Sequence, residues 1–274
     1  MFLRTLGSGS GGNATLVSTS GAGEARLLVD AGLTMRELRH RLELAGVPQR
    51  GVHHVAVTHG HLDHCKSAGA LAKRWDVPLT AAEEILEHPR LARATERRAF
   101  APDRPFEVAG TRLADGGFAA SGLQATPVRI PHDAVPTVAY RLEHDGADGL
   151  RRCVILTDMG EPDEEVCRRL RGAHLLVLEF NHDEEMLADG PYRPALKRRV
   201  AGAGGHLSNA QAARVLERLV GPELHTLVLA HLSETNNTRE LALEAAQQTL
   251  TRLGRDDVRV VVAEQDRIGP ALRV

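Results

Sequence analysis

Short apolar runs alternate with segments of helical periodicity along most of the chain. The apolar runs are rich in Val, Leu and Ile and end at Gly, Asp or His, which is typical of strands buried in a sheet. The strands that this pattern predicts are Phe2–Leu6, Ala14–Ser18, Arg26–Val29, Val52–Thr58, Leu123–Ile130, Thr137–Leu142, Cys153–Thr157, Leu175–Phe180, Thr226–Ala230 and Val258–Val262.

Between these runs, apolar residues recur at helical spacing. The helices predicted from them are Met35–Ala45, His64–Trp75, Ala81–His88, Glu161–Arg171, Asn209–Val220 and Thr238–Leu253. Ser208 and Asn209, which precede Ala-Gln-Ala-Ala, indicate a helix start, and Asp145–Gly149 is expected to be a loop. Strands follow one another in the first half and alternate with helices in the second. This mixture favours an α/β fold in which helices cover the outer faces of sheets.

The length of 274 residues favours a single domain that spans residues 1–274, since no linker or short repeat divides the chain. Hydrophobic residues make up 42% and charged residues 26%, as in ordinary globular proteins. The net charge of -2 gives no overall basic field, so any contact with nucleic acid must come from a local patch.

The cysteines and the N-terminus indicate a cytoplasmic protein. Cys65, Cys153 and Cys167 are odd in number and have no CxxC spacing, which suits a reducing compartment. The first residues, MFLRTLGSGSGGN, lack the basic segment and long apolar stretch of a signal peptide. No run approaches the roughly 18 apolar residues of a membrane span, so no membrane partner is expected.

The segment THGHLDH at residues 58–64 is the strongest chemical signal. It follows an apolar strand and precedes a helical pattern, so a turn can point its side chains inward. Imidazole suits zinc and related metals, and carboxylate adds charge and orients water. His59 and His61 alternate on one face, while Asp63 and His64 are available to a second ion. The spacing therefore indicates a site for two metal ions rather than a solvated turn.

THGHLDH resembles the signature of the metallo-β-lactamase superfamily, whose fold is an αββα sandwich of two β-sheets flanked by helices. The resemblance implies later ligands at strand ends. Matching positions are His132 in IPHD, Asp158 in LTDMG and His231 in LAHLS. It implies two divalent ions, Zn or Mn. One ion is then held by His59, His61 and His132, the other by Asp63, His64 and His231, and Asp158 bridges the two.

The segments GHLSNAQAA at 205–213 and AHLSETNN at 230–237 resemble the ribonuclease Z and phosphodiesterase branch of the superfamily. There, a His before a helix donates a proton, which assigns His206 as the general acid. With GSGSGGN, VDAG, THGHLDH, PHD, TDMG and EFNHD, the whole set is similar to the YycJ (WalJ) group of exonucleases.

This resemblance implies a phosphodiesterase that depends on two metal ions and degrades DNA as a 5′→3′ exonuclease, with nucleic acid as its partner. In that mechanism a metal-bound hydroxide attacks phosphorus. Asp63 and Asp158 orient the hydroxide, and His206 protonates the leaving oxygen. The chain has no room for the β-CASP domain of ribonuclease J-type enzymes and no long flexible arm like that of ribonuclease Z.

Two alternatives stay open. The first is a hydrolase of the same fold that acts on a small ester, thioester, lactone or cyclic phosphodiester, because the metal ligands alone do not distinguish the substrates. The second is a non-catalytic nucleic-acid-binding protein with a structural metal. An open ligand set of His and Asp disfavours it, since structural zinc sites are usually closed by four ligands.

Substrate contacts are expected near the metals. The glycine-rich start LGSGSGGN can bring backbone N–H groups close to a phosphate. The expected contact residues are Ser8, Ser10, Asn13, Asn181, His182, Ser233 and Arg198. The sequence leaves open the choice between Zn and Mn, DNA or RNA, strand preference and polarity, and the oligomeric state.

Overall fold

Two seven-stranded sheets pack face to face in the computed structural model, which describes residues 1–21 and 23–274. The first sheet has the strand order β14-β1-β2-β3-β4-β5-β6. Its strands are β1 (Phe2–Gly7), β2 (Ala14–Ser18), β3 (Arg26–Val29), β4 (His54–Ala56), β5 (Leu79–Ala82), β6 (Arg97–Phe100) and β14 (Leu272–Arg273). Strands β3 to β6 run parallel, so their carboxyl ends lie at one edge of the sandwich.

The second sheet has the order β13-β12-β11-β10-β9-β8-β7. Its strands are β7 (Phe106–Arg112), β8 (Phe118–Ile130), β9 (Thr137–Gly146), β10 (Gly149–Leu156), β11 (Leu175–Glu179), β12 (Thr226–Ala230) and β13 (Arg259–Val262). Strands β7 to β10 form an antiparallel meander, and β10 to β13 are parallel. Parallel strands buried on both faces explain the continuous apolar runs in this part of the sequence.

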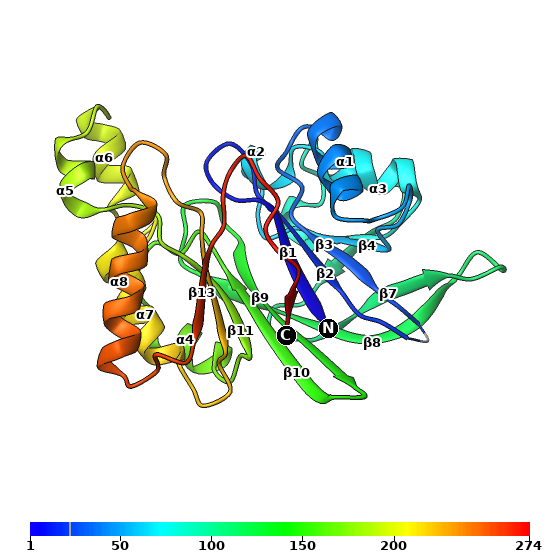
Figure 1. Ribbon diagram of the computed structural model, residues 1–274. Helices are drawn as coiled ribbons and strands as arrows, with labels where there is room; N and C mark the ends of the chain where they lie inside the picture. Colours follow the sequence, from blue (N-terminus) through cyan, green and yellow to red (C-terminus); the bar gives the residue numbers. More distant parts are fainter. Residues whose placement is uncertain (22) are drawn as a thin grey trace.

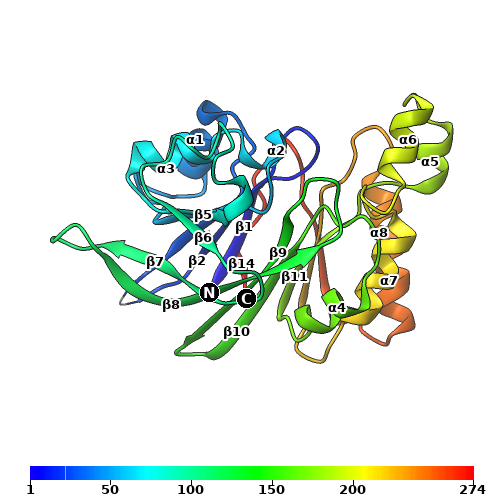
Figure 2. The ribbon, with the colours of Figure 1, turned by 180° about the vertical axis from the view of Figure 1, so that it is seen from behind.

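Helices cover the outer face of each sheet (Figures 1 and 2). The first sheet carries α1 (Met35–Leu44) and α3 (Ala68–Trp75), and the second carries α4 (Glu164–Leu170), α7 (Asn209–Leu219) and α8 (Arg239–Arg252). Shorter helices are α2 (Leu62–Cys65), the 3₁₀ turn η1 (Glu83–Ile85), α5 (Glu184–Asp189) and α6 (Pro194–Val200). The αββα sandwich that the sequence predicted is thus confirmed.

Three apolar clusters hold these four layers together. One lies between the sheets and includes Leu3, Tyr140 and Val177, none of which exceeds 1% exposure. The other two lie between each sheet and its helices. Because burial of apolar surface contributes about 25 cal/mol per Å², these clusters supply most of the stabilisation that orders the strand ends.

The predicted helix Ala81–His88 is wrong. Leu79–Ala82 is instead the parallel strand β5, and Glu83–Ile85 is a single 3₁₀ turn. All four strand residues are buried between β4 and β6, so sheet pairing outweighs the helix propensity of alanine. The predicted helix His64–Trp75 is interrupted at Ser67, whose N–H donates to the Ala31 carbonyl and whose hydroxyl donates to the Leu33 carbonyl.

The segments 97–112 and 184–200 were not predicted to be regular, yet they form β6, β7, α5 and α6. In Figure 1, α5 and α6 stand apart from the sandwich, above the ends of α7 and α8. No residue of α6 is buried. Helices α5 and α6 lie at the same end of the sandwich as α2, which carries part of the THGHLDH segment (Figure 1).

Candidate metal centre

Strand ends from both sheets deliver the polar residues of the site. Asp30 follows β3, Asp158 follows β10 by two positions, and His231 follows β12. All three have positive φ, at 62°, 60° and 55°, in the left-handed region that residues other than glycine seldom adopt. Such strain persists where the surrounding structure enforces it, and it clusters at functional sites. Here it turns each side chain away from the strand direction and toward the gap between the sheets.

The THGHLDH segment comprises the turn that follows β4 and the first three residues of α2. Gly32 allows this turn to lie directly against the loop after β3, since a Cβ on Gly32 would fall 1.6 Å from the Asp63 carbonyl oxygen. The same carbonyl accepts a hydrogen bond from the Asn13 N–H at 2.7 Å. The glycine-rich loop after β1 is therefore fastened to the turn that carries the histidines.

Four histidines have Nδ1 engaged by an acceptor, which leaves Nε2 directed inward. His64 donates to Asp30 (2.8 Å), His132 to the Gly205 carbonyl (2.9 Å) and His231 to Glu179 (2.9 Å). His59 donates to the hydroxyl of Thr58 (3.0 Å), which in turn donates to Asp30. An acceptor on one ring nitrogen sets the tautomer and orients the other nitrogen for a metal.

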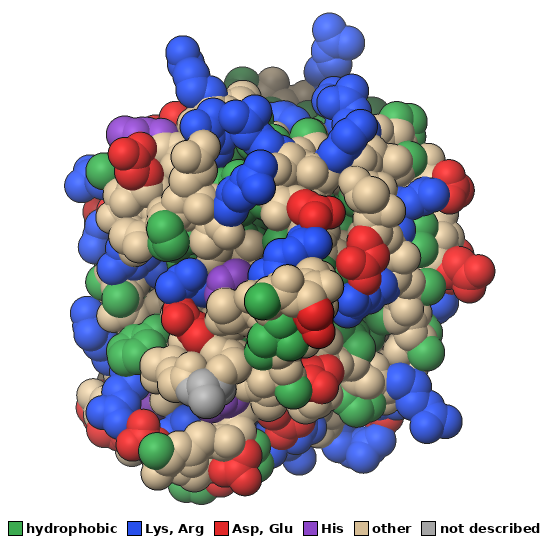
Figure 3. All heavy atoms as spheres, turned by 90° about the vertical axis from the view of Figure 1, so that its right-hand side faces the viewer, with side chains coloured by type: hydrophobic (Ala, Val, Ile, Leu, Met, Phe, Trp, Pro, Cys, Tyr) green, Lys and Arg blue, Asp and Glu red, His purple; other side chains and the backbone are tan. Residues whose placement is uncertain are grey.

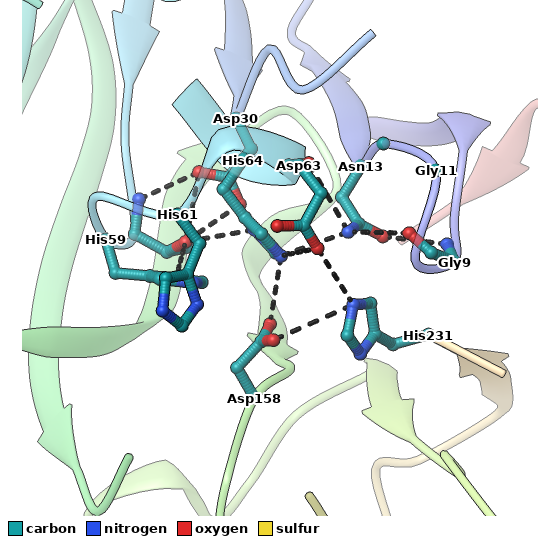
Figure 4. A network of polar contacts seen from close by, with 12 residues as sticks. Gly9, Gly11, Asn13, Asp30, His59, His61, Asp63, His64, Asp158 and His231 are labelled. Carbon is teal, nitrogen blue, oxygen red and sulfur yellow. Dashed lines mark hydrogen bonds and ion pairs between the residues drawn. The ribbon is translucent and has the colours of Figure 1, made fainter. Parts of the chain in front are cut away.

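The inward atoms form one cluster, which Figure 4 shows in part. Four overlapping groups have ligand atoms within 4.8 Å of one another. They are His59, His61 and His132; Asp63, His64 and His231; His59, His64 and Asp158; and Asp158, Glu179, His206 and His231. The carboxylate of Asp158 points between His64 and His231. Its Oδ2 lies 3.2 Å from His64 Nε2, and its Oδ1 lies 3.7 Å from His231 Nε2. We call seven of these residues the histidine–carboxylate cluster: His59, His61, Asp63, His64, His132, Asp158 and His231.

Unsatisfied atoms show that the cluster fits metal ions. Among the described residues, His59 Nε2, His231 Nε2 and Asp158 Oδ2 are buried and have no hydrogen-bond partner. Buried polar groups without partners cost free energy unless an ion or water completes them. The donor set of imidazoles and carboxylates is the one that zinc and manganese accept. Divalent ions at the cluster would satisfy all three atoms.

The electrostatics of the cluster favour a bound cation. Burial lowers the pKa values of His59 and His61, so these imidazoles are neutral and free to bind metal. Burial opposes charge on His64 as well, but Asp158 and Asp30 outweigh it and raise its pKa to about 9. Asp158 likewise helps to raise the pKa of His231 against burial. The carboxylates therefore stabilise positive charge here, and a metal ion supplies that charge while the imidazoles stay neutral.

His206 lies at the edge of the cluster, in a group with Asp158, Glu179 and His231, but outside the groups that contain His59 and His64. Its Nδ1 donates to Glu179 at 2.9 Å and lies 3.7 Å from Asp158, and its side chain is 22% exposed. Glu179, at the end of β11, is fully buried and also accepts from His231 and from the N–H groups of Met159 and Leu207. Burial opposes its ionisation, yet His206 and His231 outweigh burial and lower the pKa of Glu179 to about 2. The Glu179 carboxylate thus orients the His206 ring and lies next to any positive charge that the ring carries.

A cavity of about 260 Å³ opens above the cluster. Its residues come from the glycine-rich loop, the THGHLDH turn, the strand ends of the second sheet and α6. They are Ser10, His61, Asp63, Asp133, Asn181, Tyr192, Leu196, Arg199, Val200, Gly205, His206, His231, Ser233 and Asn236. A larger cavity of about 720 Å³ lies on the outer side of α1 and reaches none of the cluster residues.

The expected substrate contacts fall into two sets. Ser10, Asn181 and Ser233 line the cavity. Asn13 lies at its back, with Nδ2 3.0 Å from His64 Nε2, while Ser8 accepts a hydrogen bond from the His231 N–H at 2.8 Å. His182 is buried, and the exposed Arg198 is absent from the cavity lining. The neighbouring Arg199 lines the cavity instead.

Glu179, Asp30 and Thr58 are site residues whose roles the sequence did not assign. Glu179 and Asp30 are carboxylates at the ends of apolar strands, the same signal that marked Asp158. The signal was weak for Glu179 because it falls inside the predicted strand Leu175–Phe180. Their functional importance lies in the histidine nitrogens that they hold, which only the fold brings into contact.

Comparison with known proteins shows the family of the chain. Residues 25–232 match the family model described as the beta-lactamase superfamily domain. Exodeoxyribonuclease YycJ of Bacillus anthracis is 31% identical over 257 residues, covering 93% of this chain and 90% of its own. Exodeoxyribonuclease WalJ of Streptococcus pneumoniae is 30% identical, covering 86% of this chain and 83% of its own.

The fold also matches a solved structure, Zn(2+)-bound PqqB from Methylobacterium extorquens. That protein has 18% identity and a TM-score of 0.67, with 100% of both chains covered. An αββα sandwich with a histidine–carboxylate cluster between its strand ends defines a metal-dependent hydrolase. The chain belongs to the beta-lactamase superfamily and, within it, to the group that contains YycJ and WalJ. None of the described helices combines the length and apolar character needed to cross a membrane.

Proposed function

We propose that the protein is a phosphodiesterase that uses two divalent ions, Zn or Mn, and degrades DNA from the 5′ end. The observation that carries the proposal is His206, which is held by buried Glu179 beside Asp158 and lines the cavity. A phosphodiester needs a proton donor at this place because its leaving alkoxide is a poor leaving group. The exodeoxyribonuclease names of the relatives support the same substrate class.

In the proposed mechanism, each residue has a defined position. Divalent ions at the cluster would supply an activated water and neutralise charge on the phosphate. Asp63, whose side chain is 28% exposed, borders the cavity and orients the attacking water together with Asp158. The Nδ1–H group of His206 stays hydrogen-bonded to Glu179, while its Nε2–H group donates a second proton to the leaving oxygen. The Glu179 carboxylate stabilises the imidazolium that this requires.

The surface charge supports a polyanionic substrate. Figure 3 shows Lys and Arg side chains gathered along the upper part of the face that carries α1 and α3. This is the end of the sandwich from which α2 and α6 rise in Figure 1. Since the net charge is only -2, basic side chains near this end of the sandwich (Figure 3) are the groups that would attract a phosphate backbone.

The test is degradation of end-labelled DNA and RNA, with 5′ and 3′ labels in parallel, in added Mn²⁺ or Zn²⁺. Stepwise loss of DNA from the 5′ end, absent in Asp63→Ala, is the expected result. A panel of bis-p-nitrophenyl phosphate, p-nitrophenyl acetate and a lactone runs beside it. Preference for the carbonyl substrates, with no cleavage of any strand, would overturn the proposal in favour of a small-molecule hydrolase.

A further inference from the structure

One side of the cavity is built by α6 and the residues just before it, which we call the α6 wall: Tyr192, Leu196, Arg199 and Val200. The wall combines an aromatic ring, two aliphatic side chains and a guanidinium. It faces Asp63, His206 and His231 across the cavity. None of these four residues belongs to the cluster or acts as the proton donor, and Tyr192, Leu196 and Val200 have no part in the proposed metal chemistry.

Arg199 is tied to the cluster through a single carboxylate. Its Nε donates to Asp133 Oδ2 at 2.5 Å, and the other oxygen of Asp133 lies 3.6 Å from His61 Nε2 and 3.4 Å from His132 Nε2. Within the described part of the chain, no side-chain hydrogen bond engages the two Nη atoms of Arg199, and its side chain is 57% exposed. A guanidinium can hold a phosphate through its Nη atoms while Nε remains on a carboxylate, because it has five N–H donors in one plane.

The size of the cavity limits what can reach the cluster. At about 260 Å³ it lies below the roughly 300–1,000 Å³ of pockets that enclose drug-sized ligands. A space of this size favours a single nucleotide over a base pair with both of its sugars. An aromatic ring beside such a space offers a stacking surface that every base accepts.

We propose that the α6 wall is the subsite for the terminal nucleotide of the substrate, which enters unpaired and alone. The base lies against Tyr192 and Leu196, and the Arg199 Nη atoms hold a phosphate next to the scissile one. The inference rests on the proposed nuclease function and deepens it. In a duplex, the end pair must open before cleavage, and the cost of opening is smallest for a mismatched end.

The first experiment compares duplexes that differ only at the 5′-terminal pair. A mismatched terminal nucleotide should raise kcat/KM by about ten-fold over a G·C end, which corresponds to a difference of about 1.4 kcal/mol in the cost of opening the terminal pair. Equal rates on matched and mismatched ends would overturn the requirement for an unpaired nucleotide.

The second experiment tests the wall with variants. Arg199→Ala and Tyr192→Ala should each raise KM for DNA about ten-fold with little change in kcat, while Tyr192→Phe stays near wild type. Arg193→Ala, which removes an exposed charge at the start of α6 outside the cavity lining, is the matched control. Binding of a fluorescein-labelled single strand is measured by anisotropy in EDTA, where no turnover occurs. It should weaken in Arg199→Ala and Tyr192→Ala but not in Tyr192→Phe or Arg193→Ala.

The outcomes separate this inference from the proposed function. If the wild type degrades DNA and all wall variants match Arg193→Ala, the subsite is refuted and the nuclease stands. If the wild type cleaves the carbonyl panel but no DNA, the nuclease itself fails and the subsite falls with it. A loss confined to Arg198→Ala would move the phosphate contact to Arg198 and refute the role of Arg199.

Discussion

The histidine–carboxylate cluster and the α6 wall face each other across one cavity, yet they are built in opposite ways. Cluster residues such as His59, His64 and Asp158 are at most 1% exposed, and each histidine except His61 has a fixed acceptor on Nδ1. The wall stands on a seven-residue helix that buries no residue. Rigid, buried groups suit the chemical step, while an exposed wall can change to fit a substrate.

This contrast predicts that substitutions in the two regions separate cleanly. Changes in the cluster should abolish turnover of every substrate, including bis-p-nitrophenyl phosphate. Changes in the wall should affect only substrates that carry a nucleotide next to the scissile bond.

Asp158→Ala is expected to have the largest effect. Asp158 reaches both groups of ligands and is almost fully buried, so its loss leaves His59, His64 and His231 without their shared carboxylate. Metal affinity should fall by more than the roughly 10–100-fold that loss of an outer partner costs, and activity should vanish on all substrates. Metal content by mass spectrometry and turnover of bis-p-nitrophenyl phosphate measure this. Retention of both ions would remove Asp158 from the ligand set.

His206→Ala should keep the metal ions but lose turnover. The ring lies outside the groups of His59 and His64, and its Nδ1 is engaged by Glu179. Its proposed role is proton transfer, which contributes typically 10²–10⁴-fold. We expect kcat to fall within that range while metal content and melting temperature stay near wild type. A p-nitrophenolate leaving group needs less protonation than an alkoxide. The fall in kcat of His206→Ala should therefore be smaller with bis-p-nitrophenyl phosphate than with DNA. Equal losses on both substrates would argue against the acid role.

Glu179→Gln should weaken metal binding and catalysis together, by about 10–100-fold each, because one carboxylate oxygen accepts from both His206 and His231. The amide cannot accept both bonds through one charged oxygen, and it removes the charge that faces His206. Glu185→Gln on the exposed face of α5 is a matched control. If metal affinity stays unchanged while kcat falls, Glu179 serves His206 alone.

The spacing within THGHLDH indicated four residues of the cluster, because they lie in one short segment after a strand. His132, Asp158 and His231 also follow apolar strands, but the resemblance to the metallo-β-lactamase superfamily was needed to assign them. The structure brings all seven together, and His206 beside them. The strands β2, β3 and β12 also have the predicted bounds, since their apolar runs end sharply at polar residues.

The wall and the partners of the histidines could not be predicted in the same way. Tyr192 and Arg199 lie in a segment with no apolar periodicity, because α6 packs few side chains against the sandwich. Arg198 was the expected contact in this segment, but it lies in the basic run 197–199, and a run of like charges does not tell which member lines the cavity. Thr58 and Asp30 act through contacts between β3 and β4, which depend on the fold rather than on spacing.

His54 tests whether buried histidines outside the cluster affect stability only. It is fully buried at the start of β4, where Nε2 contacts the Thr80 hydroxyl at 2.7 Å and Nδ1 accepts from the Ala109 N–H at 2.9 Å. Burial lowers its pKa from 6.5 to about 3. Between these values the unfolded chain binds more protons than the folded one, so stability rises with pH across that window and is lost as pH falls.

For His54, lowering the pH from 6.5 to 5 should cost roughly 2 kcal/mol of unfolding free energy, since one pKa unit corresponds to about 1.4 kcal/mol. In His54→Gln this contribution to the pH dependence is absent, so the same pH change should lower the unfolding free energy by roughly 2 kcal/mol less than in the wild type. The variant is nevertheless less stable overall. Urea unfolding at several pH values measures the difference. Parallel slopes for the two proteins would show that His54 does not carry the pH dependence. Metal content should be equal in both.

Gln265→Ala should have the smallest effect, because Gln265 contacts the glycine-rich loop after β1 rather than the cluster itself. The Gln265 side chain accepts from the Gly11 N–H at 2.7 Å and donates to the Gly12 carbonyl at 3.0 Å, and it thereby fastens the glycine-rich loop that bears Ser10 and Asn13. Loss of these partly exposed hydrogen bonds should cost about 1 kcal/mol of stability. Activity should fall only a few-fold on DNA and on bis-p-nitrophenyl phosphate alike, since Asn13 reaches His64 whatever the substrate. Asp266→Asn is the neighbouring control. A loss on DNA alone would instead place the glycine-rich loop with the α6 wall, as part of the nucleotide subsite.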